Sequence, residues 1–247
     1  MEVFEKWLAS FGIGSAKVDT RLNQEDFFPG DQVDGQVVIR GGDSVQQIED
    51  IYLELIVEYL KDGKNVRHTY QQYYLAEKII VSPGEEKTVP LTLQLPIDLP
   101  MSTGQFPIYL QTGLDIKFAK DPSDRDRINI LPLPLIQKVL KDIEDAGFIL
   151  YRIMNSPTTK KKSRPFEQIF EFKPTGRYQG ILDKLHGKFE YNDDHVLIVF
   201  NLYRSGDIIS YSFTWEHQNP SGTLLINNQP CEEDPLSKIQ ELLIRRK

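Results

Sequence analysis

The sequence contains little cysteine and histidine, and this scarcity excludes several kinds of site. Its 247 residues include one cysteine, Cys231, and four histidines. One thiol cannot form an internal disulfide or a cysteine cluster for zinc, and such cysteine usage is typical of a reducing cytoplasm. No two histidines have the i, i+4 spacing of a helical zinc site. The sequence therefore predicts no metal and no other cofactor.

Long apolar runs and an excess of basic residues are also missing. The N-terminus carries Glu2 and Glu5 early, unlike a secretory signal, and no window reaches the roughly 20 apolar residues that span a bilayer. The 29 Lys and Arg residues face 36 Asp and Glu residues, which gives a net charge of −7. General binding to a phosphate backbone requires a basic surface. We therefore expect a soluble cytoplasmic protein that binds no nucleic acid and contacts a membrane at most peripherally.

The motifs of an activated nucleophile are absent from the sequence. There is no Gly-x-Ser-x-Gly elbow, and Cys231 stands beside Glu232 and Glu233, whose negative charge disfavours a thiolate. The glycine-rich segment 12–17 follows a predicted helix and precedes a predicted strand, which is the reverse of a phosphate-binding loop. We predict no catalytic residue and no enzymatic activity.

Strand and turn patterns dominate residues 15–130. Pro29-Gly30 predicts a type II turn, because proline presets the first φ angle and glycine accepts the positive second one. The alternation over residues 33–39 then predicts a half-buried strand. The same pattern recurs over residues 48–60, 88–95 and 107–119, with turns at 61–64 and 83–84. Short strands separated by such turns predict an antiparallel β-sandwich.

A break near residues 130–135 predicts a domain boundary. Pro132-Leu133-Pro134 interrupts the strand pattern, and residues 135–146 have the apolar spacing of a helix that ends at Gly147. Strands are expected again afterwards, over residues 148–154, 166–172, 182–191, 195–203 and 208–215. Asp234-Pro235 predicts the start of a C-terminal helix.

Two segments are candidates for contact with a partner or a membrane surface. A short N-terminal helix over residues 3–11 is expected to carry one apolar face, formed by Val3, Phe4, Trp7, Leu8 and Phe11. That face either packs on its own domain or forms a hook for a partner groove or a membrane. A basic loop contains Lys160, Lys161 and Lys162, which are either solvated or bind an anionic partner.

Charged residues near the predicted boundary form the remaining polar candidate. They are Asp115, Asp121, Asp124, Arg125, Asp126 and Arg127. Their spacing lacks the mid-loop glycine and terminal glutamate of an EF-hand, and the arginines bring competing positive charge. Two interpretations stay open: hydrogen-bonded carboxylate–guanidinium pairs that hold the domain junction, and ordinary surface ion pairs.

Several motifs in this order resemble the bacterial sporulation-control protein family, a branch of the arrestin-like clan. They are Phe28-Pro29-Gly30-Asp31 with the following Val33-x-Gly35-x-Val37, and the segments 12–20, 112–116, 121–127 and 171–175. The resemblance covers nearly the whole chain. It implies an all-β fold of two tandem arrestin-like β-sandwich domains, residues 1–131 and 132–247, with short N-terminal, linker and C-terminal helices. It also implies a charged core between the domains, for which the charged residues near the boundary are candidates.

Three functions compete on these observations. The resemblance implies a non-enzymatic cytoplasmic regulatory adaptor in sporulation control, with protein partners that bind exposed strand edges or terminal helices. A second copy of the chain is one candidate partner. The alternative is a peripheral membrane or cytoskeletal scaffold that uses the N-terminal helix and the basic loop. The third is a hydrolase built on the aspartates, which requires a metal or a perturbed carboxylate in a cleft.

Overall fold

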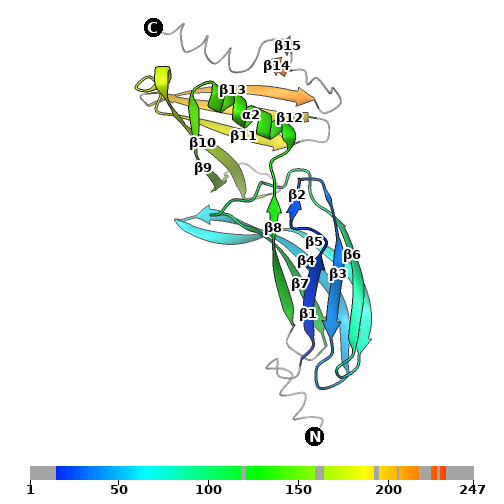
Figure 1. Cartoon of the computed structure of the whole chain (residues 1–247). Coiled ribbons are helices and arrows are strands. Elements are labelled where there is room, and N and C mark those ends of the chain that lie inside the picture. The colour runs from blue at the N-terminus through cyan, green and yellow to red at the C-terminus, as the bar shows by residue number, and fades with distance from the viewer. Residues whose placement is uncertain are drawn as a thin grey trace. The chain divides into compact units, whose positions relative to one another are not determined.

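The fold comes from a computed structural model that describes residues 15–117, 121–158, 164–191, 195–204, 206–216, 224–226 and 229–231. Strands make up most of these residues, which confirms the predicted all-β class (Figure 1). The chain divides into two compact units. The first comprises Met1–Glu58, Asn65–Pro96 and Met101–Leu131, and the second comprises Tyr59–Lys64, Ile97–Pro100 and Pro132–Lys247. The expected N-terminal and C-terminal helices lie outside the described residues.

The strands of the first unit form two sheets. One sheet has the strand order β1-β3-β6, and the other has the order β2-β8-β7-β4-β5. The strands β2 and β8 pair in parallel, whereas β3 is antiparallel to β1 and β6, and β7 is antiparallel to β4 and β8. Their bounds are β1 (Lys17–Leu22), β2 (Asp26–Phe27), β3 (Gln32–Arg40), β4 (Gln46–Lys61), β5 (Lys64–Val81), β6 (Glu86–Gln94), β7 (Ile108–Ile116) and β8 (Ser123–Ile130).

Apolar side chains from both sheets form the core of this unit. Val37 and Ile39 of β3 belong to the same buried cluster as Ile48 and Ile51 of β4 and Leu114 of β7. The alternation seen in the sequence places these residues on the inner faces of the two sheets, where burial of apolar surface is the main stabilising contribution. The first unit is therefore a β-sandwich.

The turns of the first unit follow their local sequence. Gly30 has a φ angle of +85°, and the Asp31 N–H donates to the Phe28 carbonyl over 3.0 Å. The Asp31 carboxylate also accepts the Phe28 N–H at 2.8 Å. At the tip of the β4–β5 hairpin, Asp62 and Gly63 both have positive φ angles, as a two-residue type I′ turn requires. Both predicted turns are confirmed.

The second unit contains one described α-helix and a single antiparallel meander. Its sheet has the strand order β15-β14-β13-β12-β11-β10-β9, and α2 lies across one face of it in Figure 1. The helix expected over residues 135–146 is α2 (Pro134–Asp145), and Gly147 follows it with a φ angle of +101°. The other bounds are β9 (Phe148–Pro157), β10 (Phe166–Pro174), the 3₁₀ turn η1 (Gly176–Tyr178), β11 (Lys184–Tyr191), β12 (His195–Arg204), β13 (Asp207–Glu216), β14 (Leu224–Ile226) and β15 (Gln229–Cys231).

The two faces of this sheet differ in chemistry. Phe172, Leu185 and Phe200 are fully buried, and a Cβ atom on Gly187 would contact the rings of Phe172 and Phe200. These residues therefore share the apolar face. Because successive side chains of a strand point to opposite faces, the intervening residues Glu171 and His186 lie on the other face. That polar face holds the site described below.

Candidate functional site

The charged residues predicted near the domain boundary all lie in the first unit. Asp115 is on β7, and Asp121 precedes β8, where its carboxylate accepts the Ile116 N–H at 3.2 Å. On β8, the Asp124 carboxylate accepts the Thr20 N–H of β1 at 2.7 Å. The buried hydroxyl groups of Thr20 and Thr112 lie 2.6 Å apart and link β1 to β7. Asp121 and Asp124 thus satisfy backbone donors where the strands of the sandwich meet.

The arginines of the same stretch point away from those aspartates. Asp124 and Asp126 are half-buried, whereas Arg125 and Arg127 occupy the alternate, exposed positions of β8. The Arg125 guanidinium donates to the Gln111 side chain of β7 and lies 5.6 Å from the centre of the Tyr109 ring. Arg125 therefore bonds an amide of the neighbouring strand. The predicted role of these six residues in a core between domains stays a prediction.

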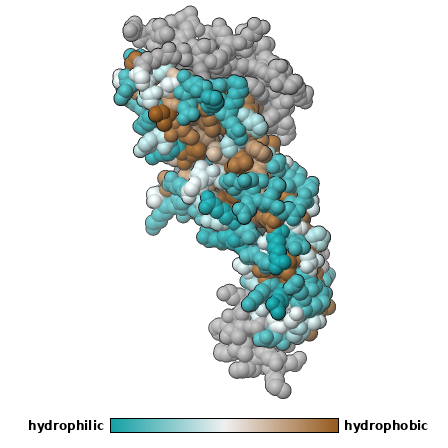
Figure 2. All heavy atoms as spheres, viewed as in Figure 1, coloured by the Kyte–Doolittle hydropathy of each residue, from teal (hydrophilic) through white to brown (hydrophobic). Residues whose placement is uncertain are grey.

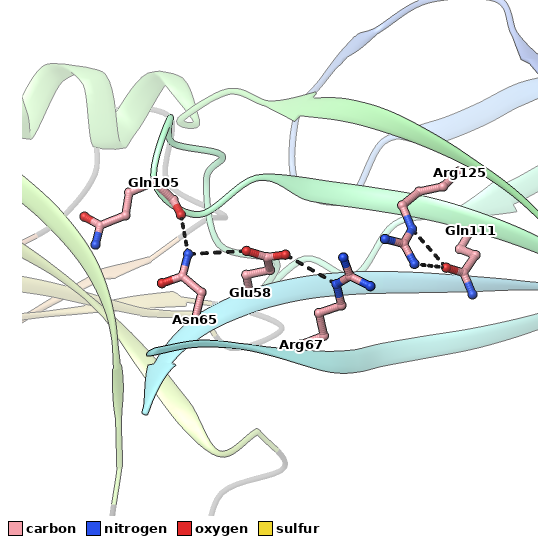
Figure 3. A network of polar contacts seen from close by, with 6 residues as sticks. All are labelled: Glu58, Asn65, Arg67, Gln105, Gln111 and Arg125. Carbon is pink, nitrogen blue, oxygen red and sulfur yellow. Dashed lines mark hydrogen bonds and ion pairs between the residues drawn. The ribbon is translucent and has the colours of Figure 1, made fainter. Parts of the chain in front are cut away.

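Figure 3 shows Arg125 and Gln111 together with a second polar group on β4 and β5. The Asn65 side-chain amide donates to the Glu58 carboxylate at 3.3 Å and to the Gln105 carbonyl at 2.9 Å. The Arg67 guanidinium lies 3.5 Å from the same carboxylate. These bonds join the hairpin to the segment that precedes β7. Glu58, which is 15% exposed, is thus bonded by both Asn65 and Arg67, and the group connects segments of the first unit.

Asp126 is a half-buried carboxylate of the first unit whose pKa is raised. Burial raises its pKa to about 6, and the negative charges of Asp124 and Asp19 act in the same direction. Its Oδ2 atom is buried and has no hydrogen-bond partner among the described residues. A protonated Asp126 can donate to Asp124, whereas an ionised one is repelled by it.

We expect Asp126→Asn to stabilise the protein at pH 8 by about 1 kcal/mol, a value reduced for partial exposure. A raised native pKa means that the folded state binds the proton more tightly, so wild-type stability falls as pH rises through about 6. The amide donates like the protonated acid and does not ionise. Urea unfolding at several pH values should show a gain that vanishes near pH 4. A gain of equal size at every pH, or one matched by the exposed Asp115→Asn, would contradict this explanation.

The segments predicted for contact with a partner or a membrane are not placed by the structure. The apolar face of Val3, Phe4, Trp7, Leu8 and Phe11, and the basic loop of Lys160, Lys161 and Lys162, lie outside the described residues. Their roles stay predictions. Within the described residues, no helix has the length and apolar character needed to cross a membrane.

A charged cluster on the second unit was not predicted from the sequence. Its centre is Glu171 of β10, and we call it the Glu171 cluster; its other members are Arg152, Lys173, Lys184 and His186. Strand pairing brings the members together, because Glu171 is the register partner of Arg152 on β9 and of His186 on β11. Arg152 and His186 each lie 3.0 Å from the Glu171 carboxylate, and the two lysines lie at 3.8 Å.

Opposing effects set the protonation states in this cluster. Burial alone would raise the pKa of Glu171, but hydrogen bonds from His186 and Arg152, with the charges of Arg152 and Lys184, lower it overall. Burial also lowers the pKa of His186; its bond to Glu171 partly opposes this effect, while Lys184 and Lys188 reinforce it. At neutral pH Glu171 is therefore ionised and His186 is neutral. The His186 Nε2–H donates to Glu171, since a carboxylate can only accept.

Two tyrosine rings border the cations of the Glu171 cluster. The Lys184 ammonium lies 4.7 Å from the centre of the Tyr203 ring, and that ring is tilted against His186. Lys173 and Arg152 lie 5.3 Å and 5.7 Å from the Tyr151 ring. Contacts of this kind stabilise a cation over a ring face by about 0.5–1 kcal/mol at exposed sites. They hold otherwise flexible side chains in place.

The cluster lies beside an exposed sheet edge. β9 is the last strand on one side of the seven-stranded sheet, and Ile149, Leu150 and Tyr151 are 54%, 37% and 61% exposed. The register shifts after Arg152↔Glu171 to Leu150↔Phe172, so Tyr151 is the extra residue of a β-bulge. Figure 2 shows exposed apolar residues on the viewed face of this unit. An exposed apolar edge strand is a template for pairing with another chain.

The exposed part of this arrangement has the features of a binding surface. The Glu171 carboxylate is bonded by Arg152 and His186, and His186 is buried between it and Tyr203. In the described part of the chain, no three His, Cys, Asp or Glu side chains are grouped as a metal ion would require. What the cluster presents to solvent is positive charge, aromatic rings and a strand edge.

Comparisons with known proteins bear on the expected family. The sequence model of the SpoOM protein family, Spo0M, matches residues 4–206. The chain is 38% identical over 211 residues to the sporulation-control protein spo0M of Bacillus subtilis strain 168. The aligned region covers 83% of this chain and 81% of that protein. The crystal structure of Spo0M, sporulation control protein, from Bacillus subtilis is similar with a TM-score of 0.75 and 31% identity, over 94% of this chain and 96% of that one. The motif resemblance is thus confirmed, and the chain belongs to the SpoOM protein family.

Proposed function

We propose that this protein is a non-enzymatic regulatory adaptor in the control of sporulation, which acts in the cytoplasm by binding other proteins. The link to sporulation rests on the 38% identical relative, a sporulation-control protein. The cytoplasmic placement rests on the single cysteine of the chain. The adaptor role rests on the structure of the second unit.

The adaptor role is supported mainly by the exposure of the β9 edge. Four consecutive residues, 149–152, are exposed on this strand, although the neighbouring strands bury an apolar face. Strand addition uses such an edge: backbone hydrogen bonds supply affinity and alternate side chains supply specificity. The bulge at Tyr151 limits indiscriminate pairing, because it twists the edge away from a flat partner. An exposed edge whose bulge limits indiscriminate pairing is suited to binding a selective partner.

Complementation tests this function directly. In a Bacillus subtilis strain that lacks its spo0M, we expect this chain to restore the wild-type frequency of heat-resistant spores. The variant Ile149→Ser with Tyr151→Ser should not restore it, because it removes apolar contacts from the β9 edge. Both side chains are exposed, so the free energy of unfolding should change by less than about 1 kcal/mol.

The matched control is Val45→Ser, which removes an equally exposed apolar side chain from the first unit. It should complement like the wild type. Immunoblots and circular dichroism verify that all variants accumulate and fold. If the intact chain accumulates and spore counts stay at the level of the deletion strain, the sporulation role is wrong. If the β9 variant complements fully, regulation does not use this edge.

A further inference from the structure

We propose that the β9 edge and the Glu171 cluster together bind an extended acidic segment of a partner protein. This inference rests on the proposed adaptor function and specifies the chemistry of the partner. The segment would add as a strand beside β9. Its carboxylates would face Arg152, Lys173 and Lys184.

The first argument is the local charge. Arg152, Lys173 and Lys184 all lie within 4 Å of one carboxylate, that of Glu171. His186 adds no charge at neutral pH. The three cations therefore exceed the single carboxylate by two positive charges. The nearby Lys188 is neutralised by Glu167 at 2.6 Å. The chain as a whole carries −7, which makes this cationic surface a local exception.

The second argument is that the cations are both accessible and ordered. The side chains of Arg152 and Lys173 are 51% and 47% exposed, whereas Glu171 beneath them is only 3% exposed. The buried carboxylate anchors one side of each cation, and the Tyr151 ring borders both. The outer hydrogen-bond donors remain available for a ligand. Such preorganisation lowers the entropy that binding would otherwise cost.

The third argument comes from the strand register. Lys173 pairs with Ile149 and Glu171 pairs with Arg152, so these residues share the polar face, whereas Leu150 pairs with Phe172 of the apolar face. A strand added to β9 would alternate in the same way. Its acidic residues would lie on the polar face, and its apolar residues would lie beside Leu150. The edge therefore selects an alternating acidic and apolar sequence.

A defined peptide tests the inference on the full chain. The probe is a fluorescein-labelled ten-residue peptide that alternates glutamate and valine, and the comparison peptide alternates lysine and valine. Fluorescence anisotropy should show saturable binding of the acidic peptide only. Binding should weaken as salt shortens the Debye length from about 10 Å at 0.1 M toward about 3 Å at 1 M.

Two charge-reversal variants separate this site from general attraction. Arg152→Glu with Lys173→Glu should weaken binding of the acidic peptide at least ~10-fold, since like charges would then face each other. Lys17→Glu with Arg40→Glu makes the same change in net charge at exposed, paired positions of β1 and β3, and should change affinity less than ~2-fold. If the first variant fails to fold by circular dichroism, Arg152→Gln with Lys173→Gln replaces it, with an expected loss of ~3-fold or more.

Several results would overturn the inference. They are equal binding of both peptides, unchanged affinity in the Arg152 and Lys173 variant, or no binding at all. A dimer by light scattering that dissociates in that variant, without peptide binding, would assign the edge to a second copy instead. Successful complementation without peptide binding would refute this inference and leave the proposed sporulation role standing. Peptide binding without complementation would refute the sporulation role and leave this inference standing.

Discussion

Replacing Glu171 with alanine is expected to lower the free energy of unfolding by about 3 kcal/mol at pH 7.5. The substitution removes a buried carboxylate and leaves His186 without its acceptor and Arg152, Lys173 and Lys184 without their shared counter-ion. The value lies at the lower end of the range for breaking a buried ion pair, because the three cations retain contact with water. Urea unfolding followed by circular dichroism measures it.

Glu171→Gln is the matched control for volume. The amide keeps one acceptor oxygen for Arg152 or His186 and lacks the negative charge, so we expect about half the loss seen with alanine. A loss of less than about 0.5 kcal/mol in both variants would mean that the cluster is an ordinary surface network. Equal losses in both would assign the effect to the charge alone.

The same cluster gives the stability a defined pH dependence. The pKa values of Glu171 and His186 are both lowered in the folded protein. A lowered pKa stabilises the folded state above the unfolded-state value, and this stabilisation is lost as pH falls through the folded-state value. The difference between wild type and Glu171→Gln should therefore be full at pH 7 and shrink below about pH 4.5. A difference that stays undiminished well below about pH 4.5 would contradict the assignment.

Replacing Gly35 with alanine is expected to destabilise the first unit by about 3 kcal/mol. Gly35 lies opposite Leu22 in the β1–β3 pair. A Cβ atom there would come within 2.4 Å of the Arg21 carbonyl oxygen and 3.1 Å of the Leu22 Cα. Both are backbone atoms, so β1 must move as a whole. The expected result is weaker pairing of β1, visible as faster amide hydrogen exchange in residues 17–22.

Gly104→Ala is the control for the entropy that any glycine replacement changes. An added Cβ atom at Gly104 has no neighbour within 4 Å, so stability should change by less than about 1 kcal/mol. Exchange in β1 should remain at the wild-type rate. If Gly35→Ala behaves like this control, the close approach of β1 does not constrain position 35.

The Gly35 result would also explain part of the motif that identified the family. In Val33-x-Gly35-x-Val37, the two valines are fully buried, while the glycine permits contact between β3 and the backbone of β1. The valines are required by the core, and the glycine is required by a neighbouring strand. A pattern of period two predicts the first requirement and says nothing of the second.

Local sequence determined the features that depend on neighbours within a few residues. The turns at Gly30 and Gly63, the alternation of Val33, Val37 and Ile39, and the helix that ends before Gly147 were predicted and are present. In each case a backbone angle or a side-chain period is set by adjacent residues, so no knowledge of the rest of the chain is needed.

Tertiary structure alone decided which polar groups meet. Arg152, Glu171 and His186 come from three strands, and only their register with the bulge at Tyr151 places them on one face. Likewise, Arg125 bonds Gln111 of β7, although aspartates flank it in the sequence. Adjacent residues of a strand point to opposite faces, so proximity in sequence separates charges that strand pairing would unite. Register depends on long-range packing, which no local pattern encodes.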